Sequence, residues 1–223
     1  MTSLRAPVPG PGLRWLAALL LSLATGLAAA QTMGRTQALF ALVHELAPER
    51  AAAVARLADV GLMEDSPRVA ERLRDEDAGV RNLAGMALWM IWSRSGDAAV
   101  DRLFARGLEQ MGRGQLKSAR ATFTRIVRQK PAFAEGWNKR ATVAFLMGDD
   151  SASLKDCDEV LKRNPLHFGA LSGMAQIHLR QGRLEEALRA WERALEVNPN
   201  IDGGPEMLEQ LEEAVRRRGG QKT

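Results

Sequence analysis

The stretch that decides the fold is "WNKRATVAFLMGDDSASLKDCDEVLKRNP", residues 137–165. A helical pattern lies on each side of Gly148, and the stretch ends at Pro165. Glycine ends a helix because it adopts a left-handed conformation at little cost, and proline cannot continue one. Trp137 and the small Ala141 share one helix face, so a second helix can approach closely. We therefore predict a hairpin of two helices.

The pattern of this stretch occurs three times in the chain. Equivalent positions lie thirty-four residues apart, namely Pro131, Pro165 and Pro199, and likewise Gly114, Gly148 and Gly182. A single hairpin leaves apolar surface uncovered, and the next hairpin in line can cover it. We therefore predict an all-α chain in which three hairpins stack into a superhelix.

The other two copies are "LFARGLEQMGRGQLKSARATFTRIVRQKP" and "LSGMAQIHLRQGRLEEALRAWERALEVNP", residues 103–131 and 171–199. Together the three copies resemble the tetratricopeptide repeat, whose signature combines a large residue, a small residue, Ala, an aromatic residue, Ala and Pro. Two positions of the middle copy depart from it. Asp150 stands at a position that is usually apolar, and Cys157 replaces the usual aromatic side chain.

The sequence divides into five segments. We expect a signal peptide at 1–30, an N-terminal helical segment at 31–98, three repeats within 99–200 (100–133, 134–167 and 168–201), a C-terminal capping helix at 202–218 and a disordered tail at 219–223. The N-terminal segment lies outside the thirty-four-residue register. Part of it resembles one HEAT-type hairpin, and a generic helical cap on the first repeat explains it equally well.

The first residues are typical of an export signal. Arg5 and Arg14 precede an apolar run from Trp15, and three alanines end at Ala30. Small residues are what a signal peptidase accepts, so we expect cleavage between Ala30 and Gln31 and secretion into a bacterial periplasm. The alternative is an uncleaved anchor, although the run is short of the ~20 apolar residues that span a bilayer. After cleavage we expect no stable membrane insertion.

Charge argues against a nucleic-acid partner. Removal of residues 1–30 takes away two arginines, which leaves 31 − 2 = 29 basic residues against 27 acidic ones. A net charge near +2 is weak support for binding a polyanion. The run Arg216 to Arg218 at the end of the capping helix is interpreted as a solvated helix end.

The acidic cluster around the single cysteine is interpreted as structural. Cys157 aligns with Phe123 and Trp191, so we expect it inside its hairpin. Asp149 and Asp150 are expected at a helix start, where carboxylates are favourable, and Asp156 and Asp158 on a solvated face.

We expect neither a metal, nor a cofactor, nor catalysis. The only histidines are His44, His167 and His178, and none has a second ligand residue at a suitable interval. The sequence also carries no nucleophile elbow or phosphate-binding loop.

The resemblance implies where a partner would bind. In tetratricopeptide repeats the first helices line a concave groove, and here those positions are Phe104, Leu108, Met111, Glu135, Asn138, Lys139, Thr142, Phe145, Ser172, Gln176 and Leu179. We expect an extended or helical peptide there, with Asn138 and Gln176 bonding its backbone. A carboxylate clamp for chaperone tails is not expected, because its places include Phe104, Leu108, Gly169 and Gly173 here.

Two alternatives stay open at this point. The N-terminal helices can cover the apolar end of the groove at Phe104, Leu108 and Met111. The protein can also be a permanent structural subunit of an envelope complex instead of a module that binds its partner reversibly. Our expectation is a non-catalytic protein-interaction module with a protein or peptide partner.

Overall fold

The structure is a computed structural model that describes residues 33–220. The predicted signal peptide and its cleavage site at Ala30 and Gln31 lie outside the described residues, as does the end of the tail. Within residues 33–220 all regular structure is helical. None of the helices in this range has both the length and the apolar character to cross a bilayer.

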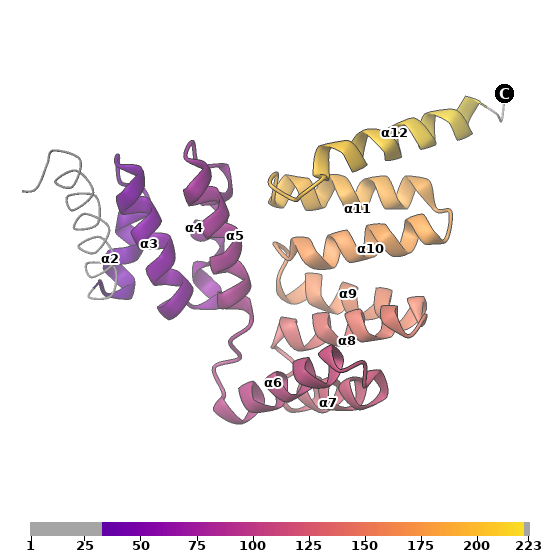
Figure 1. The fold of residues 1–223 in the computed structure, drawn as a ribbon, viewed down its shortest axis with the longest axis horizontal. Coiled ribbons are helices and arrows are strands. Elements are labelled where there is room, and N and C mark those ends of the chain that lie inside the picture. The colour runs from indigo at the N-terminus through magenta and orange to yellow at the C-terminus, as the bar shows by residue number, and fades with distance from the viewer. Residues whose placement is uncertain (1–32, 221–223) are drawn as a thin grey trace, which may run out of the picture.

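Two groups of helices are arranged side by side (Figure 1). The N-terminal group consists of α2 (Arg35–Ala41), α3 (Ala47–Val60), α4 (Ser66–Glu71) and α5 (Ala78–Trp92), with 3-10 turns η1 (Met63–Asp65) and η2 (Arg72–Arg74). The second group consists of α6 (Ala98–Gly112), α7 (Leu116–Gln129), α8 (Ala134–Leu146), α9 (Asp150–Arg163), α10 (Phe168–Arg180), α11 (Leu184–Val197) and α12 (Gly204–Gly220).

Helices α6 to α11 form three stacked hairpins, which confirms the predicted all-α superhelix. Gly148 has a φ of +79° in the turn between α8 and α9, a conformation that other residues rarely adopt. Asp149 caps α9, and its carboxylate accepts a hydrogen bond of 3.1 Å from the Ala152 amide. Both the turn and the cap agree with the sequence prediction.

The C-terminal helix α12 covers the last hairpin. Leu211 is buried against α10 and α11, and the Trp191 indole donates a hydrogen bond of 3.0 Å to the Gly204 carbonyl at the start of α12. A closing helix with one apolar face is what the end of a solenoid requires.

The N-terminal helices have a core and an ion pair of their own. Leu57 on α3 and Leu88 on α5 are fully buried in one cluster. Arg50 and Asp75 form a buried bidentate pair with distances of 2.7 and 2.8 Å, which holds the start of α3 beside the loop before α5. Paired and hydrogen-bonded in this way, the two charges tolerate burial.

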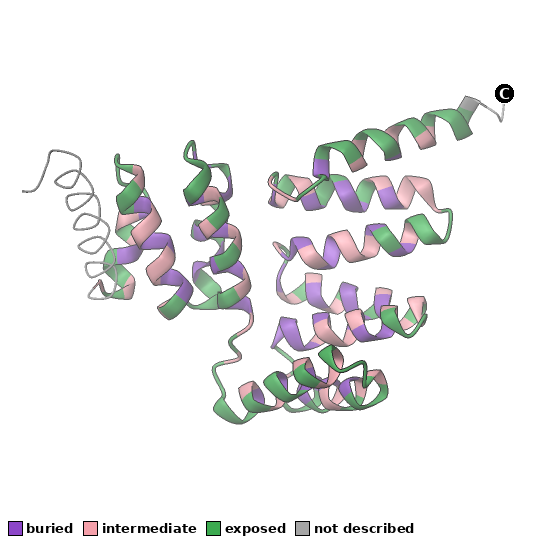
Figure 2. Cartoon of the chain, in the orientation of Figure 1, coloured by how far each residue is buried: buried purple, intermediate pink, exposed green. Residues whose placement is uncertain are grey.

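This core continues into the solenoid. Phe168, the first residue of α10, belongs to the same buried cluster as α3 and α5. The Asn200 side chain donates a hydrogen bond of 2.6 Å to the Leu73 carbonyl. Buried residues accordingly line α5 and the ends of α8 and α10 that lie nearest to it (Figure 2). The N-terminal helices thus pack against one edge of the solenoid, at the second and third hairpins.

Candidate functional site

A cavity of about 300 Å³ lies between α8 and α10, the first helices of the second and third hairpins. Its lining residues are Asn138, Ala141, Thr142, Phe145, Leu146, Ser153, Cys157, Gly169, Ser172, Gly173, Gln176 and Ile177. The floor is made of small buried residues, among them Ala141 and Cys157. A hollow of this size accommodates one or two side chains of a partner.

Five of the predicted groove residues meet in this cavity: Asn138, Thr142, Phe145, Ser172 and Gln176. The hydroxyls of Thr142 and Ser172 donate to carbonyls of their own helices, at 3.0 and 2.9 Å. Gln176 is exposed, and its amide makes no hydrogen bond with the residues that the structure describes. Gln176 is therefore the side chain in the cavity that has both a donor and an acceptor available.

Two glycines line the hollow, and one of them, Gly173, was not predicted as a groove residue. Gly169 and Gly173 lie one helical turn apart on α10, and both line the cavity. A Cβ atom added at Gly173 meets nothing within 4 Å, so the space beside it is open. Glycine inside a helix is destabilising by ~1 kcal/mol relative to alanine, and this spacing was the available signal.

The rim of the cavity is partly apolar. The guanidinium of Arg180 lies 4.3 Å from the centre of the Phe145 ring, and it also pairs with Asp150 on the neighbouring hairpin. Leu146, which lines the cavity, is 53% exposed, and Leu179, which follows Gln176 on α10 outside the lining, is 39% exposed. The polar groups of Gln176 and Asn138 suit the backbone of a peptide, and the exposed leucines suit one of its apolar side chains.

The predicted groove residues of the first hairpin lie elsewhere. Phe104 is 5% exposed, and its ring packs edge-on against Phe123 and Phe133, with centres 5.9 and 5.3 Å apart. Leu108 and Met111 pack against the same cluster. This placement differs from the expected open apolar surface, because the hairpin itself and Phe133 cover Phe104, and the N-terminal helices do not take part.

Glu135 is also buried instead of lining the groove. It is fully inaccessible, and its carboxylate accepts hydrogen bonds from His167 at 2.8 Å, Lys139 at 2.9 Å and Asn138 at 3.1 Å. The Asn138 amide nitrogen is therefore engaged, while its oxygen accepts no bond from the described residues. Of the two polar residues predicted in the groove, Asn138 lines the cavity and also donates to Glu135, while Lys139 lies outside the lining and pairs with Glu135.

The protonation of this cluster follows from its geometry. The Ala170 amide donates to Nδ1 of His167 at 3.0 Å, so the ring proton is on Nε2 and points to Glu135. Burial raises the pKa of Glu135, but the hydrogen bond from His167 and the charge of Lys139 outweigh it, so the pKa lies below its usual range. The carboxylate is thus ionised and fully paired.

This cluster joins the solenoid to α5. The His167 ring stacks on Trp92 with centres 4.8 Å apart, and the Lys139 ammonium lies 5.5 Å from the Trp89 ring. A Cβ atom at Gly169 would lie 2.5 Å from the Trp89 ring, so only glycine permits this approach. Trp89 of α5 therefore packs directly against the first turn of α10, next to Gly169 of the cavity lining.

The acidic stretch of α9 behaves largely as predicted. Cys157 is 3% exposed, and burial raises the pKa of its thiol to about 12. Asp158 is exposed, but the prediction of a solvated side chain is wrong for Asp156. Arg140 from α8 reaches it with two hydrogen bonds of 2.7 Å and covers it. Within residues 33–220 no group of His, Cys, Asp or Glu side chains has the arrangement of a metal site.

Comparison with known proteins agrees with this geometry. The sequence model of the tetratricopeptide repeat matches residues 104–165 and 168–201. A TPR repeat-containing protein of Rhizobium etli is 33% identical over 142 residues, which cover 64% of this chain and 70% of that protein. The chain belongs to the tetratricopeptide repeat family. The repeats that the sequence analysis recognised are thereby confirmed.

More distant repeat proteins share the fold. DnaJ homolog subfamily C member 3 of Homo sapiens is 29% identical over 115 residues, which are 52% of this chain and 23% of that protein. The Sgt2 TPR domain from Aspergillus fumigatus has a TM-score of 0.51 at 19% identity, over 55% of this chain and 83% of that domain. The first TPR of Spaghetti, solved with an HSP90 peptide, has a TM-score of 0.50 at 22% identity, over 52% and 93%.

Proposed function

We propose that this protein is a non-catalytic protein-interaction module that binds a peptide segment in the groove between α8 and α10. The observation that carries the proposal is the cavity of about 300 Å³, in which five side chains chosen from the repeat pattern come together. Repeat solenoids offer such concave surfaces to partners.

The chemistry of the groove defines what it binds. Gln176 offers a free amide and Asn138 a free amide oxygen, which match the carbonyl and N–H groups of a peptide backbone. The small floor and the exposed Leu146 and Leu179 match one or two apolar side chains. The partner segment is therefore short and of mixed polarity, and its backbone runs along α10.

The cellular setting belongs to the proposal. The alanine pattern that ends at Ala30 supports export from the cytoplasm, so the module works in the periplasm of a bacterial cell envelope. The N-terminal helices act as a HEAT-like unit that supports the edge of the solenoid. The buried pair of Arg50 and Asp75 and the shared core with Phe168 support this role.

A groove-filling variant tests the proposal. Gly173→Leu adds a side chain whose Cβ atom meets nothing within 4 Å, so we expect the fold to be kept and the groove to be blocked. The matched control is Gly112→Leu, since a Cβ atom there also meets nothing within 4 Å and Gly112 lies outside the cavity. A photocrosslinking residue at Leu179 reports binding in intact cells.

The expected result is a discrete crosslinked partner with the unmodified groove and with Gly112→Leu, and its loss with Gly173→Leu. Circular dichroism of both variants checks that each is folded. A crosslinking pattern that Gly173→Leu leaves unchanged would contradict binding in the groove.

The double alanine variant of Asn138 and Lys139 is not a clean test of binding in the groove. Its loss of binding would be confounded, because Asn138 donates a hydrogen bond to the buried carboxylate of Glu135 and Lys139 forms an ion pair with it. Removing them would leave a buried charge without two of its partners and destabilise the fold.

A further inference from the structure

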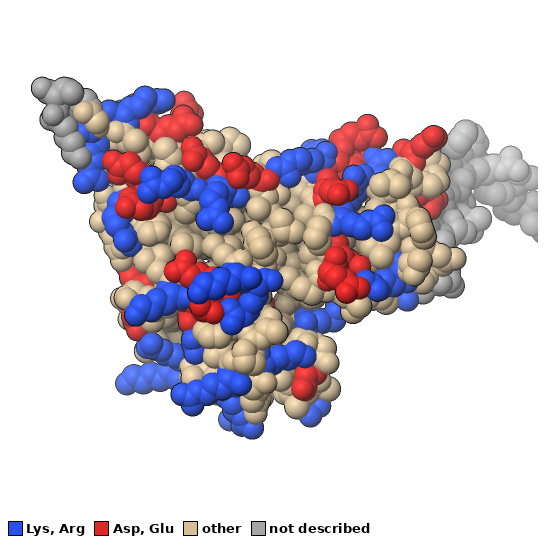
Figure 3. Space-filling model, turned by 180° about the vertical axis from the view of Figure 1, so that it is seen from behind, with Lys and Arg blue, Asp and Glu red and all other residues tan. Residues whose placement is uncertain are grey.

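The first hairpin carries an unusual concentration of positive charge. Between Ala98 and Lys130 there are eight Lys and Arg residues and two acidic residues, a net charge of 8 − 2 = +6. The next hairpin, from Pro131 to Pro165, has 5 − 6 = −1, and the third, from Leu166 to Pro199, has 4 − 4 = 0. Lys and Arg dominate the end of the molecule formed by α6 and α7 (bottom of Figure 3).

These charges are not required by the repeat fold. Lys117 and Arg128 occupy the same repeat positions as Glu185 and Glu196 in the third hairpin, which lie two repeats of thirty-four residues further along the chain. Arg125 corresponds to Glu159 in the second hairpin. Since stacked copies tolerate the opposite charge at equivalent positions, packing does not select the basic side chains here.

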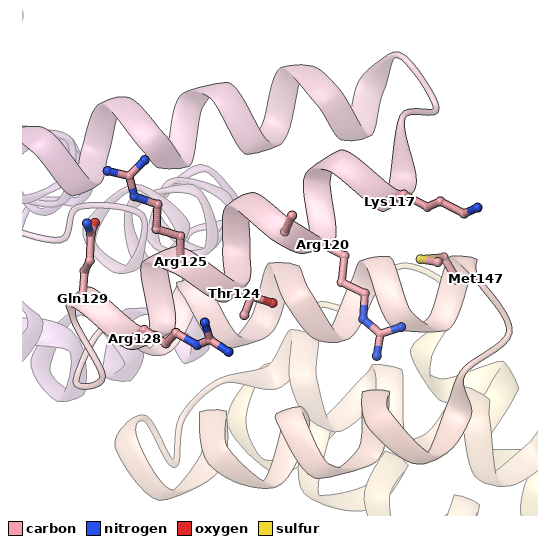
Figure 4. A pocket seen from close by; sticks show the side chains of 8 residues that line it. Lys117, Arg120, Thr124, Arg125, Arg128, Gln129 and Met147 are labelled. Atoms are coloured by element: carbon pink, nitrogen blue, oxygen red, sulfur yellow. The ribbon is translucent and has the colours of Figure 1, made fainter.

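The basic side chains surround a hollow of about 730 Å³ beside α7 (Figure 4). Its lining includes Lys117, Arg120, Arg125 and Arg128, together with Met147 from the turn after α8, and no acidic residue. Arg120 is held by a 3.0 Å ion pair with Asp149. Lys117, Arg125 and Arg128 are exposed and make no ion pair with the residues that the structure describes.

The shape indicates a polypeptide. From residue 117 to residue 128 the helix rises by eleven steps of 1.5 Å, or about 16 Å. This is the length of roughly five extended residues. Lys117, Arg120 and Arg128 follow one another along α7, so a polypeptide that lies along this helix can place acidic side chains beside them. We propose that the hollow beside α7 is a second interaction surface, which binds an acidic polypeptide segment. This surface is separate from the groove between α8 and α10 and does not depend on it.

The test uses fluorescence anisotropy with a labelled Glu-Ala repeat peptide and the matching neutral Gln-Ala peptide. We expect the purified protein to bind the Glu-Ala peptide only, and added NaCl to weaken that binding, because salt screens exposed charges. Arg125→Glu combined with Arg128→Glu should weaken binding roughly tenfold or more, since each change replaces an attraction by a repulsion.

The matched control is Arg189→Glu combined with Arg193→Glu, which changes the net charge equally on exposed positions of α11. This control should bind the Glu-Ala peptide within about twofold of the original protein. Equal loss in both double variants would overturn the proposal in favour of a net-charge effect. Absence of Glu-Ala binding would overturn it as well, whether or not phosphatidylglycerol vesicles or duplex DNA bind.

Discussion

The first hairpin and the second use charged residues in opposite ways. In the second hairpin, Glu135 and Asp156 are buried, and each is paired with a cation or a histidine. In the first hairpin, Arg125 and Arg128 are exposed and make no ion pair with the described part of the chain. Buried charges must be paired to persist, whereas exposed ones contribute little to stability and are available to a partner.

The largest loss of stability among these predictions is expected on removal of the Glu135 carboxylate. Glu135→Ala leaves Lys139 and His167 without their shared acceptor at the joint with α5, and we expect a loss of about 3 kcal/mol in the free energy of unfolding. Urea denaturation measures the change. Glu159→Ala, which removes a more exposed carboxylate of α9, serves as the control and should lose less than about 1 kcal/mol. Equal losses would contradict a special role for the joint.

The pH dependence of the unfolding free energy should also report on the Glu135 carboxylate. Because the pKa of Glu135 is lower in the folded protein, its contribution is fully present above the unfolded value of about 4.3 and is lost as the pH falls through the folded value. The unfolding free energy of Glu135→Gln should therefore decline less steeply than that of the original protein below about pH 4.3. Parallel curves for the two proteins would show that Glu135 does not contribute.

The contact between Trp89 and α10 gives the next largest effect. Gly169→Ala forces its Cβ atom into the Trp89 ring, and overpacking of this kind costs about 2 kcal/mol. Gly173→Ala on the same helix meets open space and should stabilise the protein by up to ~1 kcal/mol. Thermal unfolding distinguishes the two variants, and the same sign for both would contradict the close approach of α5.

A smaller effect is expected at the floor of the groove. Cys157→Ser buries a hydroxyl where a weakly polar thiol fits, and we expect a loss of about 1 kcal/mol in unfolding free energy. The photocrosslink from Leu179 should be unchanged, since the thiol is structural. A variant that unfolds normally and loses the crosslink would place Cys157 in direct contact with the partner.

The smallest effect on stability is expected on α7. Arg125→Glu with Arg128→Glu changes exposed side chains without ion pairs, so the unfolding free energy should shift by less than about 0.5 kcal/mol. A large destabilisation, measured by urea denaturation, would mean that these charges serve the fold and would remove the contrast between the hairpins.

The repeat register specified the fold, because Gly148, Pro165 and the small residues between them act locally. The inward position of Cys157 and the cap at Asp149 followed from the same register. The burial of Glu135 did not follow from the register. Its partner His167 lies thirty-two residues away, and Trp92 on α5 packs on the His167 ring. A stripe on one helix does not specify what packs over it.

Only part of the groove was predicted, because a stripe on one helix does not specify which of its residues another element covers. Thr142 and Gln176 follow the helical stripe and meet in the cavity, while Phe104 follows it and is covered by Phe133. The depth of the cavity depends on Gly173, where the missing side chain was a visible signal.

The central claim is that Glu135, His167 and α5 make the second and third hairpins a rigid support for the groove, while the first hairpin is held less firmly. Native-state hydrogen exchange tests it residue by residue. We predict that the amides of the first turns of α10 exchange only through global unfolding, and that amides of α7 exchange through a smaller opening. Amides of α10 that open more readily than those of α7 would contradict the claim.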